Sequence, residues 1–337
     1  MSDKKVAILG ATGVVGTQMI QCLEERNFPV SELIPLASVR SAGKKLTFKG
    51  ETVTVQEATP EAFKGVDIVL GAASDGIAKE FLPKAAEQGA ICVDNSHAFR
   101  LDEDVPLVIP EINPQDIQNH PRNIIANPNC ATIIGLVPTY PLHQVAGLTR
   151  MIVSTYQSAS GAGMPGLCEL ERETKAIANN QPVGDTAPFQ YQLAENLIPQ
   201  IGSFKEEDYT SEEWKMQNEG SKIMHLPKVR INCTCVRVPV MRSHSESITC
   251  EFERPITPEG AREALSHAPG VKVVDSPAKL EYPMPLDTSD QDLVYVGRIR
   301  KDISAPDGVN ALTFFCCGDQ IRKGAATNAV QIAEQLV

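Results

Sequence analysis

The sequence of 337 residues lacks a long hydrophobic run, an excess of positive charge and any obvious internal repeat. No segment approaches the roughly 20 apolar residues that a membrane-spanning helix needs, and the apolar run Val6–Leu9 is too short for a signal peptide. The net charge of −11 argues against a general binder of nucleic acid or of anionic membranes, although it allows a local basic pocket. The length predicts about two globular domains.

Cysteine pairs with C-x-x-C spacing are also missing, although the chain has nine cysteines. Cys233 and Cys235, and likewise Cys316 and Cys317, are too close along a strand for ordinary disulfides or zinc ligation. An odd, dispersed set is typical of a reduced, cytoplasmic protein. We therefore expect no metal site, no membrane segment and no nucleic-acid partner.

The N-terminal segment has the pattern of a dinucleotide-binding unit. A buried strand at Val6–Leu9 precedes a glycine-rich turn, and residues 17–25 have helical periodicity. The turn has G-x-x-G-x-x-G spacing, a variant of the usual G-x-G-x-x-G. Its glycines would let the backbone approach a pyrophosphate at the helix N-terminus. The turn residues expected to bind the cofactor are Gly10, Thr12, Gly13, Val14, Val15 and Gly16.

The next expected strand, residues 33–38, ends in hydroxyl groups and cations. NAD sites usually have an acidic residue at this point, which binds the ribose hydroxyls. Ser38, Arg40, Ser41 and Lys44 instead suit a 2′-phosphate, so the sequence favours NADP over NAD. A solvated basic loop is the alternative interpretation, and it is more plausible for Lys44 than for the whole cluster.

Strands and helices alternate along the first 129 residues, and the pattern then changes. The alternation predicts an α/β domain with a parallel sheet. After residue 130, longer strands with fewer crossovers predict an α+β domain with a largely antiparallel sheet. We expect strands at 149–157, 233–240, 247–252 and 311–316, and helices at 169–178, 258–266 and 319–337. The expected domains are residues 1–129, completed by the C-terminal helix 319–337, and residues 130–318.

Cys130 is the strongest candidate nucleophile. It follows the turn signal Asn127-Pro128 and precedes the apolar run 133–137, which predicts a buried helix that begins near the thiol. A helix N-terminus stabilises a thiolate and offers N–H donors to an oxyanion beside the sulfur. Since most single cysteines are small core residues, a purely structural role for Cys130 remains the alternative.

Further polar residues follow Cys130. Gln157 ends an expected strand before the glycine-rich loop 158–163, and Glu219 and Lys222 lie three residues apart on one helical face. Arg237 and His244 are seven residues apart, across a strand end and a turn. By themselves, Glu219 and Lys222 fit an ordinary helical ion pair, and a histidine such as His244 is more often structural than catalytic.

Together these motifs resemble the aspartate-β-semialdehyde dehydrogenase family. The similar segments run over nearly the full length, in the family's order, and are highly specific in combination. Two departures are His97, where the family often has serine, and the strand end 71–76. The segments that carry the resemblance are 10–16, 40–44, 94–100, 127–130, 156–157, 160–163, 218–222, 237–240, 244–245 and 324–334.

The resemblance implies a Rossmann-type NADP-binding domain, a catalytic and dimerisation domain, and a homodimer. It also implies the reductive dephosphorylation of β-aspartyl phosphate by NADPH, which gives aspartate semialdehyde and phosphate. The product lies on the route to lysine, threonine, methionine and diaminopimelate. Cys130 would form a thioester that hydride then reduces, which is covalent catalysis.

The resemblance also assigns roles to individual residues. His244 would be the general acid/base, with an unperturbed pKa of about 6.5 close to working pH. Gln157 would orient the acyl group, Arg237 would bind the α-carboxylate, and Glu219 would bind the α-ammonium. The phosphate would contact Arg100, Asn129 and Lys222, and further cofactor contacts would come from Ser74, Ser160, Gly161 and Asn328.

Two alternatives stay open from the residues alone. One is another cysteine-dependent acyl-phosphate reductase, of the N-acetyl-γ-glutamyl-phosphate or glyceraldehyde-phosphate type. An N-acetylated substrate would give Glu219 no ammonium to bind. The other is a non-catalytic NADP-sensing module, which would need only the first domain and would leave Cys130, Gln157 and His244 unexplained.

Overall fold

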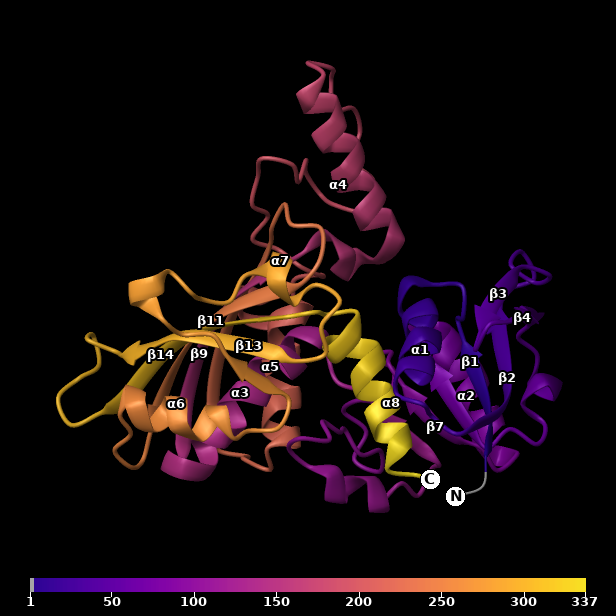
Figure 1. Ribbon diagram of the computed structural model, residues 1–337, viewed down its shortest axis with the longest axis horizontal. Coiled ribbons are helices and arrows are strands. Elements are labelled where there is room, and N and C mark those ends of the chain that lie inside the picture. Colours follow the sequence, from indigo (N-terminus) through magenta and orange to yellow (C-terminus); the bar gives the residue numbers. More distant parts are fainter. Residues whose placement is uncertain (1–2) are drawn as a thin grey trace. The chain divides into compact units, whose positions relative to one another are not determined.

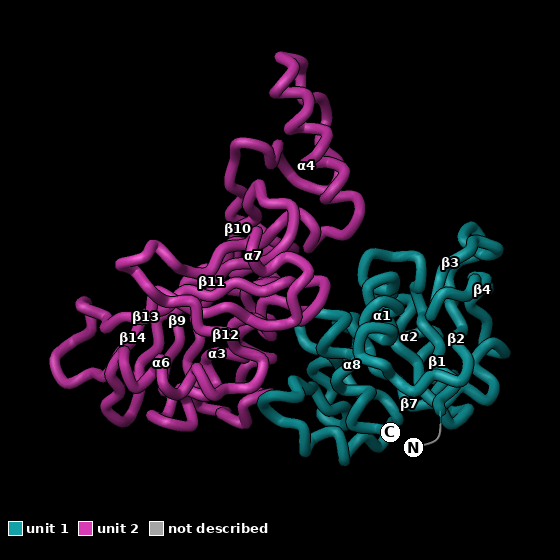
Figure 2. Tube along the Cα trace, viewed as in Figure 1, with its two compact units in different colours: residues 1–129, 325–337 teal, residues 130–324 magenta. Residues whose placement is uncertain are grey.

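The computed structural model describes residues 3–337, and the chain divides into two compact units (Figure 1). Unit 1 comprises the chain up to Asn129 together with residues 325–337, and unit 2 comprises residues 130–324 (Figure 2). The first change of unit falls where the sequence pattern changes. The return to unit 1 falls at residue 325 and not at 319, so residues 319–324 belong to unit 2.

Unit 1 is built on a six-stranded sheet in the order β5-β2-β1-β6-β7-β8. Every strand pair in this sheet is parallel, which confirms the expected Rossmann-type architecture. A separate hairpin, β3–β4, is antiparallel. The elements of unit 1 are β1 (Lys4–Leu9), α1 (Val14–Glu25), β2 (Val30–Ala37), β3 (Lys45–Phe48), β4 (Glu51–Thr54), β5 (Gln56–Glu57), β6 (Ile68–Gly71), α2 (Asp75–Glu87), β7 (Ile91–Asp94), β8 (Ile124–Ala126) and α8 (Thr327–Glu334).

The C-terminal segment is not one helix over 319–337, so that prediction is wrong in extent. Residues Arg322–Ala326 form a π-helical turn, and α8 begins at Thr327. The Asp319 carboxylate accepts the N–H groups of Ile321 and Arg322, which organises a turn in place of a first helical turn. The prediction that this helix packs on the first domain is confirmed, because α8 lies against α1 and Arg26 makes a bidentate ion pair with Glu334.

Unit 2 contains a six-stranded mixed sheet in the order β10-β9-β11-β14-β13-β12. The three central pairs are antiparallel, as expected, whereas the two outer pairs, β10–β9 and β12–β13, are parallel. Helices α3, α5 and α6 pack against the strands of this sheet (Figure 1). The elements of unit 2 are α3 (Cys130–Ala146), β9 (Leu148–Gln157), α4 (Gly163–Ala178), α5 (Ser211–Ile223), β10 (Arg230–Arg237), β11 (His244–Phe252), α6 (Pro258–Ser266), β12 (Val271–Val273), α7 (Pro285–Thr288), β13 (Val294–Lys301) and β14 (Asn310–Gly318).

Among the strand boundaries that differ from the sequence prediction, two lie at the candidate site. β10 ends at Arg237 and not at Val240, because the Val240 N–H bonds the Val238 carbonyl and turns the chain around Pro239. β11 begins at His244, three residues earlier than predicted. Both corrections matter for the site, since they place Arg237 and His244 at strand ends.

Within residues 3–337, every helix is too short or too polar to cross a membrane. The same part of the chain contains no cluster of three or more His, Cys, Asp or Glu side chains that could hold a metal ion.

Candidate active site

The register of the unit 2 sheet gathers three polar side chains at one edge. Gln157 is the last residue of β9, and Arg237, which pairs with it, is the last residue of the parallel strand β10. Because β11 runs antiparallel to β9, its first residue, His244, lies at the same edge. Side chains alternate along a strand, and all three point to the buried face that packs under the helices. Their exposed fractions are 1%, 7% and 0%.

Cys130 is the first residue of α3, as the sequence predicts. Its Sγ lies 3.4 Å from His244 Nε2, although 114 positions separate the two residues in the chain. Cys130 is partly exposed, whereas seven of the other cysteines are buried, and all nine are free thiols. A side chain at Gly324 would place its Cβ 2.9 Å from Cys130 Cβ, so a bare glycine leaves room beside the thiol.

His244 is hydrogen-bonded on both ring nitrogens. Opposite Cys130, its Nδ1 lies 3.1 Å from both the main-chain nitrogen and the Oγ of Ser158. Burial, followed by the positive charge of Arg237, lowers the pKa of His244 from 6.5 to about 3. Burial and the neighbouring guanidinium both disfavour the charged imidazolium form of His244. The general acid/base role of this residue stays a prediction.

Arg237 is held in a fixed position at the same edge. Its Nη1 donates to the Ser158 carbonyl at 2.7 Å, and its guanidinium lies 5.8 Å from the ring centroid of Phe189. Burial lowers the Arg237 pKa, and the Glu212 carboxylate opposes that shift. A Cβ at Gly161 would come within 2.6 Å of Arg237 Nη1, so packing inside unit 2 by itself requires glycine there. A cofactor contact at Gly161 stays a prediction.

Helix α5 supplies carboxylates behind Gln157. The amide of Gln157 donates to Glu212 Oε1 at 3.4 Å, and Glu212 Oε2 accepts from Lys215 at 2.9 Å. Glu219 is fully buried in the same helix, and Lys222 lies one turn further on. Sequence reasoning missed Glu212, although its three-residue spacing to Lys215 repeats the spacing of Glu219 to Lys222.

Glu246 is a second buried carboxyl group that sequence reasoning missed. It is fully buried two residues after His244 on β11, and neither side-chain oxygen has a hydrogen-bond partner within residues 3–337. Burial, followed by the charge of Glu212, raises the Glu246 pKa well above 4.5. A Cβ at Gly135 of α3 would lie 2.5 Å from Glu246 Oε2, so this glycine makes space for the carboxyl group. Period-two alternation from His244 is the signal that could have placed Glu246 inside.

In unit 1, the glycine-rich turn packs so tightly against nearby backbone that it leaves no room for side chains. Gly10 has φ +90°, and a Cβ there would lie 2.5 Å from the Ala72 carbonyl oxygen. A Cβ at Gly16 would lie 2.2 Å from the Gly10 oxygen. Helix α1 begins at Val14 without a side-chain cap on its N-terminal N–H groups. This bare helix start fits the pyrophosphate of a dinucleotide.

The other predicted cofactor residues of unit 1 differ in exposure. Ser38 and Arg40 are exposed directly after β2, Ser41 is half-buried, and Ser74 is exposed at the start of α2. Within the described chain, Arg40 makes no ion pair, so its guanidinium can accept an anionic partner. The surroundings of this loop are therefore compatible with a bound 2′-phosphate, and that contact stays a prediction.

The side chains of Asn328 and Arg100 form hydrogen bonds within unit 1. The amide of Asn328 donates to Val108 O at 3.0 Å and to Asn127 Oδ1 at 2.6 Å, which supports the segment that leads to the Asn-Pro turn. Arg100 Nη2 donates to the Asn95 carbonyl at 2.9 Å, and Asn129 is buried. Their roles toward cofactor and phosphate stay predictions.

Comparison with known proteins finds two family models that together span most of the chain. The NAD-binding domain of semialdehyde dehydrogenases matches residues 5–120, and their dimerisation domain matches residues 140–323. Aspartate-semialdehyde dehydrogenase of Aquifex aeolicus is 50% identical over 99% of this chain and 98% of its own length. The Bacillus subtilis protein of the same name is 47% identical over 98% of this chain and 96% of its own length.

Solved structures agree with these sequence relatives. The crystal structure of aspartate semialdehyde dehydrogenase II from Vibrio cholerae is 44% identical, covers 99% of this chain and 98% of its own, and has a TM-score of 0.96. The Candida albicans enzyme, solved with NADP, is 26% identical, covers 99% of this chain and 98% of its own, and has a TM-score of 0.77. With its Rossmann-type nucleotide-binding unit and its cysteine at a helix start, the chain belongs to the aspartate-semialdehyde dehydrogenase family of oxidoreductases.

Proposed function

We propose that the protein catalyses the NADPH-dependent reductive dephosphorylation of β-aspartyl phosphate to aspartate semialdehyde and phosphate. The observation that carries this proposal is the contact between Cys130 Sγ, at the N-terminus of α3, and His244 Nε2. The family relationship supports the substrate, since a Vibrio cholerae relative has been solved in complex with ASA. The product would enter the biosynthesis of lysine, threonine, methionine and diaminopimelate, in the cytoplasm, where free thiols persist.

Cys130 accepts the acyl group. Its sulfur bonds to the acyl carbon while the bond from that carbon to the phosphate oxygen breaks, so phosphate leaves and a thioester remains. The N–H groups at the start of α3 favour the thiolate and face the oxyanion that develops beside it. After reduction of the thioester, the carbon–sulfur bond breaks and releases the aldehyde and Cys130. His244, whose Nε2 lies 3.4 Å from the sulfur, would act as the general acid/base.

The cofactor part of the proposal rests on unit 1. The Gly10–Gly16 turn has no side chain that would block a pyrophosphate, and the start of α1 offers uncapped N–H groups to it. Bound NADPH supplies the hydride that reduces the acyl carbon. Arg40, with Ser38 and Ser41, would bind the 2′-phosphate that distinguishes NADPH from NADH.

Substrate recognition is assigned to charges that match the substrate. The planar guanidinium of Arg237, fixed by the Ser158 carbonyl, suits the α-carboxylate. The buried carboxyl group of Glu219 suits the α-ammonium, and Gln157 would orient the acyl group against Cys130. Phosphate contacts are assigned to Arg100, Asn129 and Lys222.

The direct test is a spectrophotometric assay in the oxidative direction. Aspartate semialdehyde, phosphate and NADP should give NADPH, with arms in which N-acetyl-glutamate semialdehyde replaces the substrate and NAD replaces NADP. We expect turnover with aspartate semialdehyde to exceed turnover with the N-acetylated aldehyde by about 10³-fold, because an N-acetylated substrate leaves a buried carboxyl group unpaired. Comparable rates with both aldehydes would overturn the substrate assignment.

We also propose a homodimer formed through the open face of the unit 2 sheet. The matched family domain is a dimerisation domain, and the face opposite α3 presents Tyr156, Ser247 and Phe315. Ser247→Arg in the middle of this face should convert a dimer to a monomer, because an unpaired charge would be buried. Ser266→Arg, on the exposed side of α6, is the control. A dimer that persists in Ser247→Arg during sedimentation analysis would exclude this face.

A further inference from the structure

Glu212 is a buried carboxyl group that contacts the candidate site from α5. Its Oε1 lies 3.4 Å from Gln157 Nε2, and its Oε2 accepts a hydrogen bond from Lys215 Nζ at 2.9 Å. Glu212 is 8% exposed and Gln157 is 1% exposed, so bulk water competes little for the contact between them. One carboxyl group thus links a partly exposed lysine of α5 to the last residue of β9.

The sequence around Glu212 builds a rigid helix start. Thr210 caps α5, and the side chains of Thr210 and Glu213 each accept the main-chain N–H of the other in a capping box. The second oxygen of Glu213 accepts the Cys235 N–H at 3.0 Å, which attaches this helix start to β10, the strand that ends at Arg237. Because Glu212 lies in the first turn, the helix N-terminus also favours its ionised form. The first turn of α5 therefore holds this carboxylate in a fixed place beside β10.

The partners of Glu212 fix which way the Gln157 amide points. The Lys215 ammonium can only donate and an ionised carboxylate can only accept, so the amide atom that faces Glu212 is the NH₂ group. The same NH₂ group lies 3.3 Å from Thr155 Oγ1, which can accept its second hydrogen. The Gln157 carbonyl oxygen then remains as an acceptor, and it has no hydrogen-bond partner within residues 3–337. Without a charged acceptor at position 212, the amide could also take the opposite orientation.

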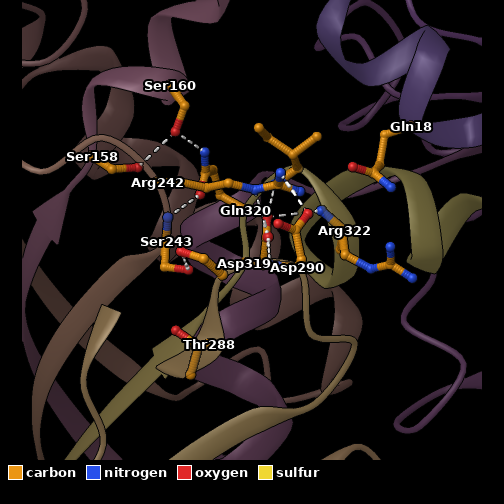
Figure 3. Close-up of polar contacts among 12 residues, drawn as sticks. Gln18, Ser158, Ser160, Arg242, Ser243, Thr288, Asp290, Asp319, Gln320 and Arg322 are labelled. Carbon is orange, nitrogen blue, oxygen red and sulfur yellow. Dashed lines mark hydrogen bonds and ion pairs between the residues drawn. The ribbon is translucent and has the colours of Figure 1, made fainter. Parts of the chain in front are cut away.

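The main chain next to Gln157 is held in place independently. Ser158 follows Gln157 directly, and its carbonyl accepts from Arg237 Nη1 at 2.7 Å. Ser158 Oγ lies 3.0 Å from Ser160 Oγ, which in turn bonds Gln320 (Figure 3). The backbone of Gln157 is therefore fixed by β9 and by this loop, and the freedom that remains lies in the side-chain amide.

We propose that Glu212 is a positioning residue that holds the Gln157 amide in one orientation, with its NH₂ group toward α5. The inference rests on the proposed function, in which Gln157 orients the acyl group against Cys130. Glu212 acts through Gln157 and takes no part in bond making or bond breaking. The capping box and the ion pair with Lys215 serve the same end, since they keep the carboxylate ionised and in place.

Proton–nitrogen NMR of the cofactor-free protein tests the contact without turnover. Glutamine side chains are labelled with ¹⁵N, and the Gln157 NH₂ signals are assigned by their absence in Gln157→Ala. In Glu212→Gln a neutral acceptor replaces a charged one, so the Gln157 NH₂ protons should shift upfield as their hydrogen bond weakens. Gln157 signals that do not move in Glu212→Gln would overturn the proposal, whether or not the substrate assignment is correct.

A double-mutant cycle tests the consequence for the reaction. Glu212→Gln should lower kcat by about 10- to 100-fold, because the amide that orients the acyl group is no longer held. In a Gln157→Ala background the same change should lower kcat by less than about threefold, since Glu212 then has no amide to hold. Equal losses in both backgrounds would show a merely structural role and refute the proposal. Absence of turnover in the natural protein would contradict the proposed function, and the NMR shift would still decide whether Glu212 holds Gln157.

Two further variants separate the contact from the stability of α5. Glu212→Asp keeps the charge that pairs with Lys215, so it should fold even if Glu212→Gln does not. Its carboxylate is one methylene shorter and withdraws from Gln157, so the upfield shift and the dependence on Gln157 should both persist. Glu213→Gln is the matched control, since this neighbouring glutamate bonds the main-chain nitrogens of Thr210 and Cys235. It should lower the thermal unfolding temperature and leave the Gln157 signals in place, and an equal shift in Glu213→Gln would overturn the proposal.

Discussion

The N-terminus of α1 in unit 1 and the N-terminus of α3 in unit 2 both present helix N–H groups to a candidate ligand, but they are built in opposite ways. At α1 the site consists of backbone, and Gly10 and Gly16 contribute by the absence of a Cβ. At α3 the site consists of side chains, where Cys130 meets His244 and the edge of a sheet. A backbone site can lie in one contiguous segment, whereas a side-chain site depends on strand register.

This contrast predicts that single side-chain changes act most strongly at α3. Cys130→Ala should lower kcat by about 10⁴-fold or more, because no other group forms the thioester. NADP affinity should stay unchanged, since the cofactor turn lies in unit 1. Activity is measured by NADPH formation and affinity by calorimetry. Cys168→Ala, which removes an exposed thiol, is the control. Substantial turnover in Cys130→Ala would show that Cys130 is not the nucleophile.

His244→Asn tests the second side chain of the α3 site. It should lower kcat by about 10²- to 10³-fold, because asparagine cannot act as the general acid/base. KM should change by less than about threefold if His244 acts mainly in the transition state. His267→Asn, at an exposed histidine after α6, is the matched control. A variant in which KM rises and kcat is retained would reassign His244 to substrate binding.

Arg40→Asp tests how much side chains add to the backbone site of unit 1. Loss of a charged contact to the 2′-phosphate should weaken NADP binding by about 10- to 100-fold. NAD, which lacks that phosphate, should be affected by less than about threefold on the same grounds. Lys45→Asp reverses a charge on β3 and serves as the control. Equal losses for NADP and NAD in Arg40→Asp would mean that the 2′-phosphate is bound elsewhere.

Glu246→Gln addresses stability in unit 2. Because the folded state raises the pKa of this carboxyl group, its contribution is fully present below pH 4.5 and is lost as the pH rises. The variant does not ionise, so its advantage over the natural protein should grow by about 1.4 kcal/mol per pH unit above 4.5, until the folded-state pKa is passed. Thermal unfolding of both proteins between pH 4.5 and 8.5 measures this difference. The exposed Glu206→Gln should show no such trend.

Much of the fold follows from local patterns. The apolar run at Val6–Leu9, the glycine turn and the helical periodicity after it are all present where the sequence predicts them. α6 has the predicted bounds, and α3 begins at Cys130 as predicted. The errors lie at element ends. Asp319 reorganises the start of the C-terminal helix, and the turn at Pro239 ends β10 early.

The residues of the candidate site also differ in whether the sequence alone can identify them. Cys130 and the glycine turn can be recognised locally, because a helix start and the spacing of the glycines each lie in one contiguous segment. The environment of His244 cannot be recognised in this way, since its lowered pKa depends on burial and on Arg237, and its hydrogen bonding depends on Ser158. Glu246 was missed for the same reason. Glu246 lies two residues after His244 and therefore on the same face of β11. This spacing predicts burial of Glu246 only when that face is known to be the buried one.

Local patterns in the sequence were enough to predict the parallel sheet of unit 1, the thiol at the start of α3 and the family resemblance. Those properties rest on contiguous residues and on short-range backbone geometry. The shared sheet edge of Gln157, Arg237 and His244 follows only from the pairing of β9 with β10 and β11. Strand pairing brings together groups that lie far apart in the chain. Burial then strengthens their hydrogen bonds and charge interactions, because the local dielectric constant is low.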